Sequence, residues 1–477
     1  MPALPALRSV VTRLRTTRTA TPARFRLAFV AALALLVVGM SVKYAAKVSK
    51  PGDGGQLTRS AFLRWRAMIH DVFAGENVYV GANEYPNPPV MAIILKPFAD
   101  LPPVTGALAW FYAKVLMAVA AAVWVFRLLD EGVGGRTGEG VSRGSGDSES
   151  SEAVPFTPSP LHPFSPSHFP DAAKAVAILL ALPALLGDLS HNNVNIFILF
   201  LVAGCLEAYR RGWDVAAGVV LALAIACKVT PLLFVAYFAW KRAGAVVASC
   251  AAGLVLWLAV VPGAVYGWDR NAELLESWFD LMVRPALVEN RVTSEHPNQS
   301  IPGVVFRLLT HSPSFVVYPD NIPTPAAFHN LADIGTSNAR WVVKACIAAF
   351  GVLIVCLCRA PRGERRGWRF AAECSLIVLG MLLFSERTWK HHAVTLLLPF
   401  AVIARGVFGP GVGDRMKAWL AGLLVGVGLL TTVPGLLPTH TADLALVYGT
   451  HTAAFLLLTA GVATLLLTAR GRRGEPA

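Results

Sequence analysis

The sequence predicts an all-α polytopic membrane protein, a bundle of about twelve transmembrane helices with an amphipathic helix in an extracytoplasmic loop. Composition is the first reason, because 55% of the 477 residues are hydrophobic and only 15% are charged, more than a soluble domain can bury. Many apolar runs also approach the roughly 20 residues that cross the hydrocarbon core. The net charge of +13 collects in short basic connectors, which is typical of cytoplasmic loops rather than of a nucleic-acid surface.

Basic connectors set the orientation that we expect for the chain. Residues 1–26 contain six arginines and no acidic residue, so this segment is expected to stay in the cytoplasm. A segment rich in Gly, Ser and Pro follows the second span and is typical of a cytoplasmic linker. The expected divisions are a cytoplasmic N-terminus (1–26), two spans (27–129) joined by an external loop (43–105), the linker (130–171), the remaining bundle (172–469) with a large external loop (263–339), and a cytoplasmic tail (470–477).

The apolar stretch 215–240 has two interpretations, because Lys228 and Pro231 interrupt it. One is a single kinked span in which Lys228 snorkels toward the interface. The other is a pair of half-spans with Lys228 at the outward tip. We favour the second, because Lys241 and Arg242 then stay cytoplasmic. A lysine deep in apolar sequence is costly and usually has an anionic partner.

Four polar connectors, at 51–89, 187–195, 263–339 and 385–392, fall on the side opposite the basic ones. The fourth has the sequence SERTWKHH, which carries far more ionisable groups than a turn requires. Cations in such a place can hold a phosphate, because they stabilise the charge that grows on a departing phosphate oxygen. The candidate phosphate-binding residues are Lys228, Arg387, Lys390, His391 and His392.

A carboxylate that faces these cations would take a proton from an attacking hydroxyl group. The first external loop offers Asp53, Asp71 and Glu84. Asp53 is our first choice for this base, and Asp71 is our second. A simpler interpretation of each acid is a solvated or helix-capping side chain, since Asp53 precedes an amphipathic segment at 58–74.

The seven cysteines are scattered, mostly within apolar segments. Their spacing is not that of a zinc site or of a disulfide framework. We therefore expect no metal and no cofactor. The apolar composition predicts that the helices contact membrane lipids.

Five motifs that occur in order resemble glycosyltransferase family 87, membrane enzymes of the GT-C type that include polyprenyl-phosphomannose-dependent α-mannosyltransferases. The resemblance covers roughly residues 57–410. Singly each motif is loose, but five in order are fairly specific. The motifs are Gly75…Tyr79…Tyr85-Pro-Asn-Pro-Pro89, Asn192…Asn195, Ala217-Gly218…Lys228-Val-Thr-Pro231, Asn298-Gln299-Ser300 with Arg307, and Ser385…Trp389-Lys-His391-His392.

The resemblance implies a GT-C-like fold, a polyprenyl-phosphate sugar donor and a lipid or glycan acceptor. It also implies a metal-independent, inverting hexosyl transfer, with mannose as the expected sugar. The site would face the extracytoplasmic side of a bacterial cytoplasmic (inner) membrane, and an aspartate of the first external loop would be the base. The residues expected to orient the sugar or the acceptor are Asn192, Asn195, Asn298, Gln299 and Tyr85.

The sequence departs from the family where the acid usually stands, because residues 59–64 contain no carboxylate. Either Asp53 or Asp71 has taken the role, or the chain is a catalytically inactive relative. A transporter or a lipid-linked sugar flippase is the rival from another class, since a bundle of about twelve spans with both ends inside suits it as well. Transporters usually show two related halves, and we find no internal repeat in the sequence.

Overall fold

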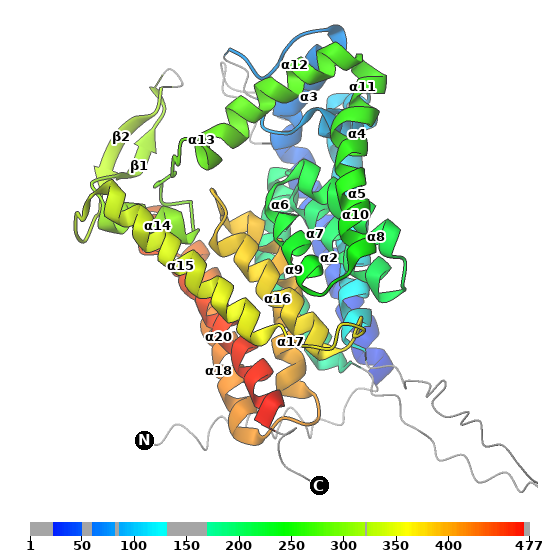
Figure 1. Ribbon diagram of the computed structural model, residues 1–477, viewed down its shortest axis with the longest axis vertical. Coiled ribbons are helices and arrows are strands. Elements are labelled where there is room, and N and C mark those ends of the chain that lie inside the picture. The colour runs from blue at the N-terminus through cyan, green and yellow to red at the C-terminus, as the bar shows by residue number, and fades with distance from the viewer. Residues whose placement is uncertain (1–21, 50–59, 82–84, 131–168, 320–321, 472–477) are drawn as a thin grey trace, which may run out of the picture.

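The computed structural model describes residues 22–49, 60–81, 85–130, 169–319 and 322–471 (Figure 1). Asp53, Glu84 and most of the linker at 130–171 lie outside these residues. The described chain is a bundle of long helices with a small two-stranded sheet, so the all-α membrane class is confirmed.

Eight helices of the described chain have the length and composition to cross a membrane, and three shorter apolar helices accompany them. The predicted count of about twelve spans is therefore not confirmed. Two further helices, α7 (Asn195–Arg210) and α16 (Trp368–Leu383), bury almost every side chain and form the centre of the bundle. The eight are α2 (Pro22–Val48), α5 (Pro103–Leu129), α6 (Asp171–His191), α10 (Gly244–Val255) continued by η2 (Leu256–Val260) and α11 (Val261–Tyr266), α15 (Gly335–Leu357), η5 (Lys390–Leu396) with α17 (Leu397–Phe408), α18 (Asp414–Thr432) with η6 (Val433–Leu436), and α20 (Thr450–Gly471).

Helices α8 (Asp214–Cys227) and α9 (Leu233–Trp240), with η1 (Thr230–Leu232) between them, form a re-entrant pair. Arg365 forms an ion pair with Asp214 at the start of α8, in which Nη2 donates to Oδ2 at 2.9 Å. Lys241, directly after α9, donates to the carbonyl of Ala360 at 2.9 Å. Because Arg365 and Ala360 lie in the same connector between α15 and α16, both helices meet the same end of the bundle. Lys228, in extended conformation (φ −158°, ψ 124°), is the tip, as the two-half-span interpretation predicts.

Glycines bring α8 and α10 into backbone contact. A Cβ added to Gly218 would lie 2.0 Å from Oγ of Ser249 and 2.4 Å from the carbonyl of Val246. A Cβ on Gly253 would lie 2.7 Å from the Cβ of Ala222. Small residues at such positions allow close helix packing where no aqueous hydrophobic effect drives association. This contact fixes the re-entrant pair against α10.

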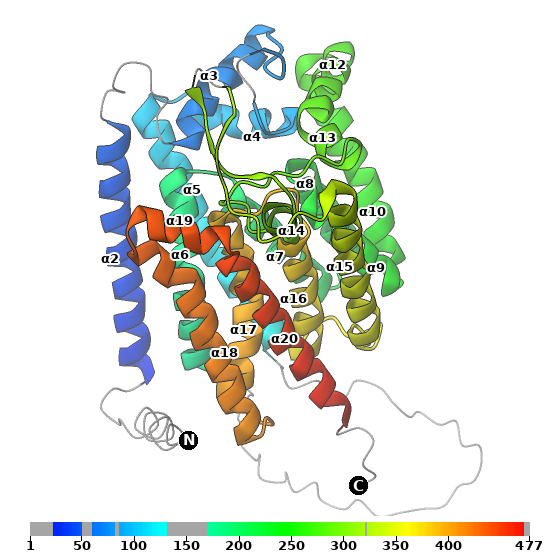
Figure 2. The ribbon, with the colours of Figure 1, turned by 90° about the vertical axis from the view of Figure 1, so that its left-hand side faces the viewer.

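The described parts of the polar connectors lie in the upper half of Figures 1 and 2, away from the first residues of α2 and the last of α20. The amphipathic helix is present as α3 (Ala61–Ala74), which buries Phe62, Trp65 and Ile69. The connector elements include a hairpin of antiparallel strands that pairs Pro313 with Phe328. The other elements there are α4 (Pro89–Ala99), α12 (Trp268–Trp278), η3 (Phe279–Val283), α13 (Arg284–Leu287), α14 (Ile301–Leu309), β1 (Pro313–Val317), β2 (Thr324–Phe328) and α19 (Thr439–Val447).

Candidate functional site

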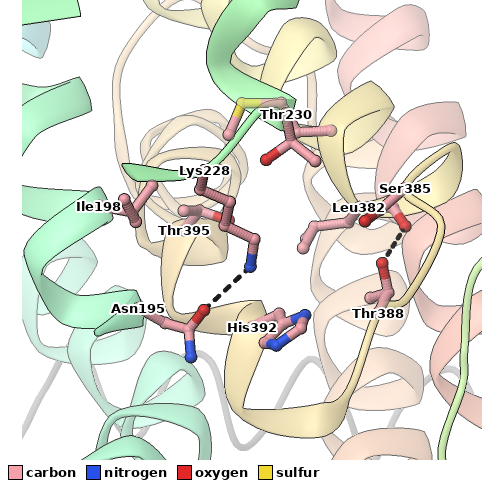
Figure 3. A pocket seen from close by; sticks show the side chains of 10 residues that line it. Asn195, Ile198, Lys228, Thr230, Leu382, Ser385, Thr388, His392 and Thr395 are labelled. Atoms are coloured by element: carbon pink, nitrogen blue, oxygen red, sulfur yellow. Dashed lines mark hydrogen bonds between the residues drawn. The ribbon is translucent and has the colours of Figure 1, made fainter. Parts of the chain in front are cut away.

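A small cavity of about 10 Å³, with room for about one water molecule, lies where the re-entrant tip, α7, the end of α16 and the connector before α17 meet (Figure 3). Its wall is mixed, with one ammonium group, an imidazole, an amide and several hydroxyl groups beside apolar side chains. The ammonium and hydroxyl groups of this wall are donors that can bind an anion. The lining residues are Asn195, Ile198, Lys228, Thr230, Met381, Leu382, Ser385, Thr388, His392 and Thr395.

Lys228 supplies the positive charge of this cavity. Its Nζ donates a hydrogen bond of 2.9 Å to Oδ1 of Asn195, and the ring of His392 lies beside it (Figure 3). An ammonium group has three hydrogens to donate, and in the described part of the chain Asn195 is its sole acceptor. Lys228 therefore keeps donors available for an anion.

A fully buried carboxylate, that of Asp188, binds the same Asn195 amide that Lys228 contacts. Nζ of Lys114 lies 3.2 Å from its Oδ2, and both side chains are inaccessible to solvent. Its Oδ1 accepts a hydrogen bond of 2.9 Å from Nδ2 of Asn195. The sequence analysis missed both charged residues. A lone lysine within the apolar run of α5 was the available signal, because a buried charge of this kind needs a partner.

Histidines and a tryptophan form one wall of the connector before α17. The ring centroids of His391 and His392 are 4.9 Å apart, and His191 from the end of α6 lies 5.2 Å from His391. The backbone N–H of Trp389 donates to Nδ1 of His392 at 3.3 Å, while the two rings stack. The structure thus brings His391, His392 and Lys228 together, as predicted, and adds His191.

Asn298 uses its whole amide group inside the protein. Its Nδ2 donates to the carbonyls of Thr293 and Glu386 at 2.7 and 2.8 Å. Its Oδ1 accepts from the N–H of Thr388 at 2.9 Å. No amide hydrogen remains for a sugar hydroxyl, so the geometry does not support the predicted sugar contact. Asn298 instead positions the connector that carries the histidines.

Gln299 is used in the same way, because its Nε2 donates to the carbonyls of His296 and Leu446, each at 2.7 Å. Its predicted sugar contact is likewise not supported. The carbonyl of Leu446 also accepts from Arg307, which is fully buried. Burial lowers the pKa of Arg307 to about 10, which still leaves the guanidinium charged at neutral pH. The guanidinium donates, at 2.8 to 3.2 Å, to the carbonyls of Ser294, Glu295, Asn298, Leu446 and Val447.

Asn192 and Tyr85, which were also predicted to orient a sugar or an acceptor, are completely buried. Nδ2 of Asn192 donates to the hydroxyl of Tyr44 at 2.8 Å and to the carbonyl of Ala107 at 3.0 Å. These bonds tie α6 to α2 and α5 and leave no amide hydrogen for a ligand, whereas Oδ1 has no hydrogen-bond partner among the described residues. The hydroxyl of Tyr85 has no hydrogen-bond partner among the described residues.

Arg387 and Lys390 are exposed. Arg387 lies 3.1 Å from Glu386 and donates to Oγ1 of Thr293 at 3.0 Å, so its guanidinium faces that loop. Lys390 interacts electrostatically with His191. Lys390 therefore belongs to the basic cluster around the histidines, whereas Arg387 lies at its edge.

The start of α3 reaches this cluster. Oγ of Ser60 lies 2.7 Å from the hydroxyl of Tyr44, and Arg64 interacts electrostatically with His191 at the end of α6. Asp71 comes eleven residues after Ser60, about 16 Å further along the helix axis, so the structure does not bring it to the cations. Asp53 precedes Ser60 by seven residues, a chain length of at most about 25 Å. Its position stays outside the described residues.

A protein-family model and a known relative match the sequence of this chain. The model of "Glycosyltransferase family 87" matches residues 85–385. The chain is 26% identical over 275 residues to the "Polyprenol-phosphate-mannose-dependent alpha-(1-2)-phosphatidylinositol mannoside mannosyltransferase" of Mycolicibacterium smegmatis, which covers 56% of this chain and 54% of the relative. The chain thus spans about half the length of that relative.

Among solved structures, ArnT from Cupriavidus metallidurans bound to undecaprenyl phosphate has a TM-score of 0.39 and 15% identity, over 95% of this chain and 79% of that one. The apo state of ArnT has a TM-score of 0.37 and 13% identity, over 94% and 78% of the two chains. Scores this low carry no correspondence between residues. The family model, in contrast, matches more than half of the sequence, and the chain belongs to glycosyltransferase family 87.

Proposed function

We propose that the protein is an integral membrane glycosyltransferase that moves a hexose, mannose, from a polyprenyl-phosphate sugar to a lipid or glycan acceptor. The site would face the extracytoplasmic side of a bacterial inner membrane. One observation carries the proposal: the half-spans α8 and α9 present Lys228, with donors to spare, to a cavity that it shares with His392. Family membership and the donor in the relative's name support the choice of substrate.

In this reaction the acceptor oxygen forms a bond to the anomeric carbon while the bond from that carbon to the phosphate oxygen breaks. The electron pair of the broken bond goes to the phosphate, and the acceptor's proton goes to a carboxylate. Lys228, His391, His392 and Lys390 would stabilise the growing phosphate charge. Asp53 would accept the proton. Attack from the face opposite the phosphate inverts the anomeric carbon, and none of these steps calls for a metal.

The test uses the full chain in lipid nanodiscs, a radiolabelled polyprenyl-phosphate mannose and a lipid extract as acceptor, with and without EDTA. Wild-type protein is expected to transfer label in both conditions. Lys228→Met should lower kcat by about 100-fold or more, the usual cost of removing a group that stabilises developing charge. The matched control is Lys344→Met, since Lys344 is exposed on α15, and it should keep wild-type kcat.

Asp53→Asn should abolish transfer while the protein level in the membrane is unchanged, whereas full activity would exclude Asp53 as the base. Uptake of labelled sugar into sealed vesicles, measured beside transfer, separates an enzyme from a transporter. Wild-type protein that moves sugar across the bilayer but forms no glycosidic product would overturn the proposal.

A further inference from the structure

Asp188 lies in the last turn of α6 and is surrounded by hydrogen-bond donors. Beyond Lys114 and the amide of Asn195, it accepts from the backbone N–H of Asn195 at 3.3 Å and from that of Ile196 at 3.4 Å. These N–H groups open α7, where a carboxylate is favoured by the helix dipole and by unpaired donors. The carboxylate is therefore held rigidly between α5, α6 and α7.

This bonding pattern fixes which way the amide of Asn195 points. Its Nδ2 donates to Asp188 at 2.9 Å, and its Oδ1 accepts from Lys228 at 2.9 Å. An amide without a fixed neighbour can rotate so that its nitrogen and oxygen exchange places. In the rotated state the NH₂ group would face the ammonium and repel it. An acceptor on the far side of Asn195 is thus required to hold Lys228 in place.

The amide also separates two charges that would otherwise pair. A carboxylate bound directly to Lys228 would neutralise it and compete with an anionic ligand. Asp188 pairs with Lys114 instead, at 3.2 Å, and acts on Lys228 through a neutral amide. Lys228 is oriented while its charge stays available to the cavity.

We propose that Asp188 is a positioning residue of the transfer reaction, which acts through Asn195 to orient Lys228 toward the donor phosphate. This inference rests on the proposed function. It gives Asn195 the role of a relay to the phosphate-binding lysine rather than that of a sugar-binding residue. It also explains why the fully buried ion pair of Lys114 and Asp188 lies next to Asn195 of the cavity wall, although burying these charges costs desolvation free energy.

The test is a double-mutant cycle in the full-length protein. Asp188→Asn combined with Lys114→Met removes both charges of the buried pair, so that neither is left unpaired. This variant should lower kcat by about 10- to 100-fold, because an active-site group is displaced. The KM for the acceptor should not change. Combining Asp188→Asn and Lys114→Met with Lys228→Met should lower kcat by less than about twofold beyond Lys228→Met alone. The effects of groups that act through one another are not additive.

A second buried pair provides the matched control. Lys241 lies 2.6 Å from Glu373 at the base of the re-entrant pair, and both side chains are buried. Lys241→Met with Glu373→Gln removes charges of the same kind far from the cavity, and kcat should stay within about twofold of wild type. Binding of undecaprenyl phosphate, followed by tryptophan fluorescence without acceptor, should weaken in the Asp188 variant and not in this control.

The combined variant could lose as much kcat as the product of the two separate losses, or the Asp188 variant and the control could lose equal activity. Either result would mean that Asp188 acts on the fold alone. If Lys228→Met keeps wild-type kcat, the role of Asp188 fails together with that of Lys228. If the wild-type protein transfers no sugar but binds undecaprenyl phosphate in an Asp188-dependent way, the proposed function fails while the positioning role holds.

Discussion

Arg307→Met is expected to destabilise the protein strongly, for a reason that can be counted in the structure. The guanidinium is the sole donor, among the described residues, to the carbonyls of Ser294, Asn298 and Val447. The residue four positions after Asn298 is Pro302, which has no N–H to replace it. The substitution would leave three buried acceptors without partners.

A buried acceptor that loses its donor costs about 1–3 kcal/mol, so three of them predict a loss of about 3–5 kcal/mol after some rehydration. Methionine fills part of the volume and offsets little of this, because the carbonyls stay buried. Arg307→Lys should recover part of the loss, since its ammonium reaches fewer carbonyls than the guanidinium does.

The assay is thermal unfolding in nanodiscs, followed by intrinsic tryptophan fluorescence. The expected decrease in Tm for Arg307→Met is on the order of 5 °C. Arg340→Met is the matched control, because Arg340 is exposed on α15 and surface changes usually stay within about 0.5 kcal/mol. A Tm for Arg307→Met that equals that of the control would refute the reasoning.

Three further outcomes are expected from the same assay. Gly218→Val should lower Tm and the yield of folded protein, because its Cβ would lie 2.0 Å from a side-chain oxygen of α10. Lys241→Met alone should cost about 3–5 kcal/mol by leaving Glu373 charged and buried, and adding Glu373→Gln should restore part of that loss. Burial lowers the pKa of His296, so the unfolded chain binds more protons below about pH 6.5 and stability falls as the pH is lowered. His296→Gln should show a smaller loss of Tm between about pH 7 and pH 5, and an unchanged loss would mean that His296 is not responsible.

The sequence was sufficient for the features that depend on hydrophobic pattern and charge sign. It predicted the amphipathic α3, the half-spans on either side of Lys228 and the common end of the polar connectors. The predicted number of about twelve spans is not confirmed, because α7 and α16 have only 16 residues each and are not among the eight described helices of spanning length. Helices of that length are shorter than a usual span, and their burial in the bundle rather than their length makes them central.

The candidate site was predicted unevenly, for a physical reason. Lys228, His391 and His392, which the structure brings together, stand out in the sequence because charged groups in apolar surroundings have few alternative uses. Asn192, Asn298 and Gln299 were assigned to a ligand, but their amide hydrogens bind other groups of the protein, mostly backbone carbonyls. A sequence does not reveal which carbonyls lie nearby, so the donors of a polar amide cannot be assigned from it.

The buried Arg307 also has a consequence for how the protein is made. It joins carbonyls near residue 295 to those of Leu446 and Val447, which leave the ribosome about 150 residues later. Until then, Arg307 has only the acceptors of its own loop, the carbonyls of Ser294, Glu295 and Asn298. Synthesis of α19 then supplies the two remaining carbonyls, so a segment made much later completes the hydrogen bonds of the earlier loop.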